Sequence, residues 1–106
     1  MSLPIEKAVE VVKQNLSEVC TVQEWADVMG FKSSRQFSKN FRDHYGVRPS
    51  KKITQIKIER VKMLINESEE VKHFIIANEI GLPDEQALYK FMKYHTGQSP
   101  SGIRQV

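Results

Sequence analysis

The sequence has little cysteine and no long hydrophobic run, and both absences exclude whole classes of protein. With one cysteine among 106 residues no internal disulfide can form, so the fold must be held by packing, and nothing indicates an oxidising compartment. No apolar run approaches the roughly 20 residues of a membrane-spanning helix, and the N-terminus lacks the basic start and apolar stretch of a signal peptide. We therefore expect a cytoplasmic protein with one small domain, or with two half-size domains that share a core.

Residue groups that would perform chemistry are also missing. Three histidines, one cysteine and scattered carboxylates form no recognisable catalytic set, and there is no glycine-rich phosphate loop. His44 and His95 occupy equivalent places, but no cysteine stands beside them at metal-ligand spacing. Cys20 has no neighbouring base, and we expect it to be a buried spacer. We expect no enzyme activity, no cofactor and no metal.

What the sequence does have is an uneven distribution of charge. The net charge is only +3, but residues 32–52 hold seven basic side chains against one acidic, which gives +6. Residues 53–66 carry +2 and residues 90–106 carry +3, whereas residues 1–31 carry −3 and residues 67–89 carry −5. Basic blocks therefore alternate with acidic blocks about fifty residues apart.

The same spacing appears as an internal repeat. A shift of 51 positions superposes WADVMGFKSSRQFSKNFRDHYGVRPS (25–50) on IANEIGLPDEQALYKFMKYHTGQSPS (76–101), with seven identities over 26 positions. The identical pairs are Ala26 and Ala77, Gly30 and Gly81, Lys39 and Lys90, His44 and His95, Gly46 and Gly97, Pro49 and Pro100, and Ser50 and Ser101. Because glycine and proline constrain the backbone, these identities indicate a repeated chain geometry.

Each copy predicts a helix, a short turn and a second helix. In the first copy Thr21 and Glu24 form a capping box, so a helix starts at about residue 22 and runs to the turn at Gly30. Ser33 is the next N-cap, and Gly46 ends the second helix. Apolar residues at every fourth position give this second helix its buried face: Phe37, Phe41 and Tyr45. Trp25, in the first helix, is expected in the core.

The second copy repeats these signals with different residues. Gly81 makes the turn, Asp84 is the N-cap, and Gly97 and Pro100 close the second helix. Its apolar face consists of Leu88 and Met92, with Phe91 beside them.

The remaining segments also favour helices. Pro4 suits a first helical turn, and one apolar stripe follows it: Ile5, Ala8, Val9, Val12 and Leu16. Residues 50–66 contain no Gly or Pro and predict a rod of about 25 Å, with Ile53, Ile56, Val61, Leu64 and Ile65 near one face. We predict an all-α fold of about seven helices: a helix-turn-helix subdomain at 1–49, a linker helix at 50–67 and a second subdomain at 68–106.

The outward faces of the two second helices carry long hydrogen-bond donors and no carboxylate. At 100° per residue, the positions opposite the buried face are Arg35, Ser38, Lys39 and Arg42 in the first copy and Gln86, Tyr89, Lys90 and Lys93 in the second. Arg and Lys pair with guanine edges and phosphates, Gln pairs with adenine, and a helix fits the major groove of B-DNA. We predict these eight residues as base contacts, and as phosphate contacts Lys32, Arg48, Lys51 and Lys52.

These residues also carry a family resemblance. The segment IKIERVKMLI (56–65) is similar to the pattern R-L-x-R-A-x-x-L-L, and residues 76–104 resemble I-A-x-x-x-G-F-x-[DS]-x-S-Y-F-x-R-x-F-K-K-x-x-G-x-[ST]-P-x-x-Y-R. Both patterns belong to the DNA-binding domain of the AraC family of bacterial transcription regulators, which the chain resembles from about Ile5 to Arg104. The chain departs from the pattern at Leu82, Pro83, Ala87 and Met92, and also at Asn40 and Gly102, so the second unit is expected to be packed less firmly.

The resemblance implies a monomer that inserts two recognition helices, at about 34–45 and 85–96, into consecutive major grooves of double-stranded DNA. The expected site is asymmetric, because the two helices differ in sequence. The resemblance further implies RNA polymerase as a partner, and an effector or dimerisation domain outside this chain. We expect the C-terminal domain of a longer regulator, with a free-standing small regulator as the alternative.

Two other interpretations stay open at this point. A helical module that binds an acidic protein would explain the basic faces but not the duplicated turns, whereas no residues support an enzyme acting on nucleic acid. The repeat also places His73 opposite Val22, at a core-like position, and puts Phe74 and Ile75 where polar residues are usual. We expect a small shift of helix phase that buries these two residues; the alternative is an exposed apolar contact patch.

Overall fold

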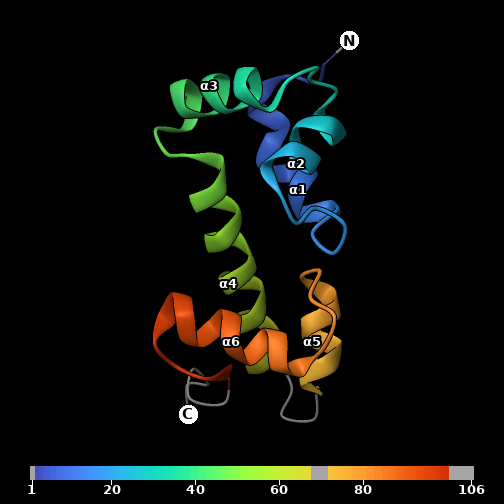
Figure 1. Ribbon diagram of the computed structural model, residues 1–106, viewed down its shortest axis with the longest axis vertical. Helices are drawn as coiled ribbons and strands as arrows, with labels where there is room; N and C mark the ends of the chain where they lie inside the picture. The colour runs from blue at the N-terminus through green and yellow to red at the C-terminus, as the bar shows by residue number, and fades with distance from the viewer. Residues whose placement is uncertain (1, 68–71, 101–106) are drawn as a thin grey trace. The chain divides into compact units, whose positions relative to one another are not determined.

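The described part of the chain, residues 2–67 and 72–100 of a computed structural model, contains helices and no strands (Figure 1). In chain order the elements are the 3₁₀ helix η1 (Ile5–Lys7) and the α-helices α1 (Ala8–Gln14), α2 (Val22–Met29), α3 (Ser34–Tyr45), α4 (Pro49–Glu67), α5 (His73–Glu79) and α6 (Glu85–Thr96). The prediction of an all-α fold is confirmed. Gly102 and Arg104, at the end of the family resemblance, lie outside the described residues.

The chain divides into two compact units, residues 1–56 and residues 57–106. The point of division lies within α4, whose first residues belong to unit 1 and whose later residues belong to unit 2. The finer partition at 49/50 and 67/68 stays a prediction.

The start of α2 and the turns that follow α2 and α5 have the predicted geometry. In unit 1 the Thr21 hydroxyl accepts a hydrogen bond from the Glu24 backbone N–H at 3.1 Å, while the Glu24 carboxylate accepts one from the Thr21 N–H at 3.0 Å. Gly30 then adopts φ +84° and Gly81 adopts φ +85°, a left-handed conformation that other residues rarely take. The capping box itself is not repeated, because Lys72 at the start of α5 offers no side-chain cap.

An aromatic cluster forms the core of unit 1. Trp25, Phe37 and Phe41 are fully buried, and the Trp25 ring centroid lies 5.4 Å from that of Phe37 and 4.9 Å from that of Phe41. Tilted and edge-on rings at such distances add stabilisation beyond the burial of their area. The Trp25 Nε1–H donates to the Ala8 carbonyl at 3.1 Å, so the one polar atom of this ring is also satisfied.

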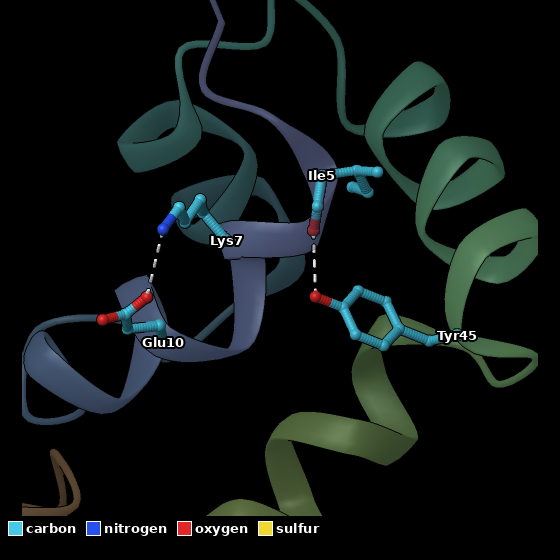
Figure 2. Close-up of polar contacts among 4 residues, drawn as sticks. All are labelled: Ile5, Lys7, Glu10 and Tyr45. Atoms are coloured by element: carbon cyan, nitrogen blue, oxygen red, sulfur yellow. Dashed lines mark hydrogen bonds and ion pairs between the residues drawn. The ribbon is translucent and has the colours of Figure 1, made fainter.

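The N-terminal segment is held against this cluster by polar contacts as well as by packing. The Tyr45 hydroxyl, at the end of α3, donates to the Ile5 carbonyl at 2.9 Å (Figure 2). The Leu3 N–H donates to the Met29 carbonyl at 2.8 Å. The nearby pair Lys7 and Glu10 is solvent-exposed, with 3.9 Å between charged atoms, and contributes little. The segment before α1 thus helps to fix the position of α3.

Unit 2 buries the same register positions with aliphatic side chains. Ile76, Leu88 and Met92 stand where unit 1 has Trp25, Phe37 and Phe41, and all three are fully buried. Ala77 and Ile80 of α5, and Val61 and Ile65 of α4, are buried as well. An ion pair between Arg60 and Glu79, at 3.6 Å, links α4 to α5 within this unit.

The expected burial of Phe74 and Ile75 is wrong. Their side chains are 49% and 48% exposed, because α5 keeps the register of α2 and turns Ile76, Ala77 and Ile80 inward. Since the helix phase does not shift, the two residues stay on the surface.

The expectation that Cys20 is buried is also wrong, because this residue is exposed. It lies just before α2, where its backbone N–H donates to the Glu24 carboxylate at 3.1 Å. The neighbouring Val19 is fully buried and takes the core position instead.

The difference between buried and exposed aromatic residues predicts a stability contrast. Phe41→Ala should lower the free energy of unfolding by about 3–5 kcal/mol, because it empties a ring-sized space beside Trp25. Phe74→Ala should cost less than about 1 kcal/mol, because the ring is half in water already. Urea denaturation followed by circular dichroism measures both, and equal losses would contradict this description of the core.

Candidate nucleic-acid interface

The second helices of the two pairs, α3 and α6, begin and end in the same way. The Ser33 hydroxyl accepts from the Gln36 N–H at 3.1 Å, and the Asp84 carboxylate accepts from the Ala87 N–H at 2.8 Å. Each helix has 12 residues and ends at a glycine with φ +77°, Gly46 or Gly97. The two helices are therefore built alike despite their different sequences.

The predicted outward residues lie at the surface of both helices. On α3 the side chains of Arg35, Lys39 and Arg42 are exposed and Ser38 is partly exposed. On α6 all four predicted residues are exposed: Gln86, Tyr89, Lys90 and Lys93. Within the described residues none of these eight side chains forms a hydrogen bond or an ion pair, so their donors are available to a ligand.

In unit 1 these residues surround an open depression, here called the α3 hollow. It has a volume of about 480 Å³, and Val22 and Pro49 are among the residues that line it. Its basic side chains are Arg35, Lys39, Arg42 and Arg48. The α3 hollow thus combines the four predicted base contacts of α3 with one predicted phosphate contact. The like charges of its four basic side chains favour an anionic ligand.

The other predicted phosphate contacts are less closely grouped. Lys51 joins Arg42 and Arg48 around an adjoining depression of about 490 Å³. Lys52 is half-buried on α4. Lys32 lines a different depression of about 750 Å³, together with Leu3 and His44. Arg48 and Lys51 are therefore the two that the structure brings next to the predicted base contacts of α3.

Unit 2 has a depression at the same place, here called the α6 hollow. It has a volume of about 300 Å³ and is lined by His73, Glu85, Gln86, Tyr89, Ser99 and Pro100. Five of these residues are the repeat partners, by the offset of 51, of residues that line the α3 hollow. The lining described for the α6 hollow contains no Lys or Arg. The two hollows therefore lie at equivalent positions of the repeat but differ in charge.

The hollows also contain residues that sequence reasoning missed as part of the site. Val22 and His73 begin the first helix of each pair, and Pro49 and Pro100 follow the second helix. The repeat pairs these residues correctly, but it also gives Val22 and His73 a core-like position. Their half-burial at the edge of a hollow depends on how the two helices cross, which periodicity does not specify.

Other kinds of site find little support in the described part of the chain. It contains no group of three or more His, Cys, Asp or Glu side chains placed to hold a metal ion. Within the same residues, no helix has the length and apolar character to cross a membrane.

Comparison with known proteins places the fold. Neither the protein-family models nor the curated protein sequences give a match. Among solved structures, the DNA-binding domain of the global transcriptional factor AdpA, crystallised with a target DNA, superposes with a TM-score of 0.76 at 23% identity, covering 94% of this chain and 88% of that one. The C-terminal domain of AraT, a response regulator from Geobacillus stearothermophilus, gives 0.80 at 20% identity, with 94% and 82% covered. A regulator with an AraC-type DNA-binding domain from Chromobacterium violaceum gives 0.73 at 21% identity, with 94% and 88% covered.

The chain has the fold of AraC-type DNA-binding domains. The resemblance seen in the sequence is thus confirmed at the level of the fold. In the AraC-type fold described here, α2 with α3 and α5 with α6 are the two helix-turn-helix pairs, and the two hollows lie along their second helices.

The hydrogen bond at the N-terminus of α6 predicts how much Asp84 stabilises this helix. Asp84→Ala removes the acceptor for the Ala87 N–H and should cost about 1 kcal/mol of stability. Asp84→Asn keeps a side-chain oxygen at the cap and should retain most of it. Amide hydrogen exchange in the first turn of α6 measures the effect, and equal protection in the three proteins would contradict a role for this cap.

Proposed function

We propose that this chain binds specific sequences of double-stranded DNA as the DNA-binding domain of a bacterial transcription regulator of the AraC family. The observation that carries the proposal is the duplicated helix-turn-helix pair, with unpaired donors exposed along the second helix of each copy. The complex of the similar AdpA domain with its target DNA supports the same function.

Base recognition is assigned to the outward side chains of α3 and α6. Arg35, Lys39 and Arg42 suit guanine edges, and Ser38 accepts or donates a hydrogen bond at either kind of base pair. On α6, Gln86 suits adenine, Lys90 and Lys93 suit guanine, and the half-exposed ring of Tyr89 offers apolar surface beside its hydroxyl. Each helix would therefore select a different short block of sequence.

Phosphate binding is assigned to Arg48 and Lys51 beside the α3 hollow, with Lys52 and Lys32 as outer contacts. Such contacts fix the orientation of a protein on the duplex without selecting its sequence. Their position next to α3 would hold this helix in its groove.

The DNA site should be asymmetric. One chain carries two different recognition helices, so the two blocks need not be related by a two-fold axis. We propose that they lie in consecutive major grooves, about 34 Å or one helical turn apart.

The chain would act by binding rather than catalysis, within the cytoplasm, and would alter the recruitment of RNA polymerase to a promoter. A parent protein in which this domain is C-terminal is supported by the AraT neighbour, which is the C-terminal domain of a response regulator. An effector or dimerisation domain would then lie outside this chain.

Paired alanine substitutions on the two recognition helices test the division of the site. Lys39→Ala should relax base preference in one block only and Lys90→Ala in the other, each by about 1–3 kcal/mol for a bidentate contact. Unbiased site selection with the wild-type chain and both variants measures the preferences.

Gln23→Ala, on the exposed side of α2, serves as the control and should leave both blocks unchanged. Uniform weakening on all sequences would make Lys39 or Lys90 a phosphate contact, and a palindromic optimum would contradict the asymmetric site. Failure to bind any duplex, together with binding of an acidic protein, would favour the interaction module instead.

Salt dependence tests the phosphate contacts. Arg48→Ala should weaken binding to all duplexes alike and reduce the slope of log K against log salt by about 0.9, the contribution of one neutralised phosphate. Titrations between low and physiological salt measure this slope. A flat salt dependence of the wild-type chain would contradict DNA binding altogether.

A further inference from the structure

The α6 hollow contains a histidine where the repeat has valine. His73 is the first residue of α5, as Val22 is the first residue of α2, and each lines the hollow of its own unit. The two residues have the same half-buried setting. The exchange therefore puts a titratable ring at a position that is purely apolar in unit 1.

The surroundings of His73 leave its ring available. No hydrogen bond or ion pair involves it within the described residues. Along α6 it shares the hollow with Glu85, Gln86 and Tyr89, and after α6 with Ser99 and Pro100. Gln86 and Tyr89 are predicted base contacts, so the imidazole lies at the border of the proposed recognition surface.

Charge makes this position significant. Four Arg and Lys side chains line the α3 hollow, whereas the only fixed charge described in the α6 hollow is the carboxylate of Glu85. A phosphate near Glu85 would be repelled. Among the described residues that line this hollow, a protonated His73 is the one group that offsets that repulsion, and it offers two N–H donors.

We propose that His73 is a DNA-backbone contact of unit 2 that binds a phosphate in its protonated form. This inference rests on the proposed function. In helix-turn-helix proteins the first helix of the pair crosses the phosphate backbone while the second enters the groove, and His73 begins the first helix of unit 2. Its contact is with the phosphate common to every nucleotide, so it adds affinity without sequence preference.

Proton uptake follows from this contact. A neighbouring phosphate favours the charged imidazolium, so binding of the duplex is coupled to proton uptake by the His73 ring. The phosphate contact is therefore strongest at low pH, where the ring is protonated, and is lost as the pH rises. Among the residues described in the lining of the α6 hollow, the other ionisable side chains that face His73 are Glu85 and Tyr89.

The test is the pH dependence of binding to the duplex obtained by site selection with the wild-type chain. At constant salt, fluorescence anisotropy should give an affinity that is about tenfold higher at pH 5.5 than at pH 8.5, because only the protonated ring binds the phosphate. His73→Val, which restores the residue of unit 1, should match the wild type within about twofold at pH 8.5 and lose most of the gain at pH 5.5.

The other two histidines provide the matched control. His44 and His95 are exposed near the ends of α3 and α6, so His44→Gln with His95→Gln should keep the pH dependence. In the wild-type chain, the NMR titration of the His73 ring with and without duplex measures the pKa change directly and needs no variant.

Each outcome separates the inference from the function on which it rests. Binding that does not vary with pH, an unchanged dependence in His73→Val, or an unshifted His73 pKa in the complex would each overturn the phosphate contact while leaving DNA binding intact. If the wild-type chain binds no duplex at any pH, the proposed function itself fails.

Discussion

The burial of one stripe of side chains on α3 determines most of what this molecule presents to solvent. Phe37 and Phe41 pack against Trp25, and this packing fixes the rotation of the helix about its own axis. Once the rotation is fixed, Arg35, Lys39 and Arg42 lie on the outward side, because at 100° per residue their positions point away from the buried stripe. The hydrogen bond from Tyr45 to the Ile5 carbonyl adds a directional restraint at the end of the helix, where apolar packing alone resists sliding poorly. The exposed donors owe their position to this core rather than to any contact among themselves.

Unit 2 meets the same geometric requirement with less aromatic area. Ile76, Leu88 and Met92 fill the register positions of the aromatic cluster, and methionine in particular adapts to irregular space without fixing one arrangement. The start of α5 also lacks the side-chain cap that Thr21 gives to α2. Aromatic packing and the capping of the first helix therefore stabilise unit 2 less than unit 1. The position of α6 depends more on its own two ends, where Asp84 accepts a backbone hydrogen bond and Gly97 turns the chain. The caps of α3 and α6 are alike although the two cores differ in composition. The two units therefore have the placement of the second helix in common rather than the residues of the core.

Much of this architecture could be predicted from the sequence, because its strongest signals are backbone signals. The glycines at 30, 46, 81 and 97 have positive φ as their positions in the repeat indicated, and Ser33 and Asp84 cap the helices they were expected to cap. The failures have a common physical origin. Side-chain type alone suggests burial of Phe74, Ile75 and Cys20, whereas the register of α5 turns Ile76, Ala77 and Ile80 inward and Val19 takes the core position beside Cys20. The hollows were missed because they depend on the crossing of two helices, which no single-helix pattern contains.

The charge difference between the two hollows has a consequence for recognition. Cations near a helix that enters a groove bind the phosphates of any sequence, so they raise affinity for correct and incorrect sites together. Around the α3 hollow, with Arg35, Lys39, Arg42 and Arg48, this general attraction is large. The described lining of the α6 hollow has no such surplus, so a wrong base opposite the proposed contacts Gln86 or Tyr89 would be compensated less by phosphate attraction. If the chain binds DNA as proposed, unit 1 would contribute most of the sequence-independent affinity for DNA. Unit 2 would make the larger relative contribution to discrimination against incorrect sequences.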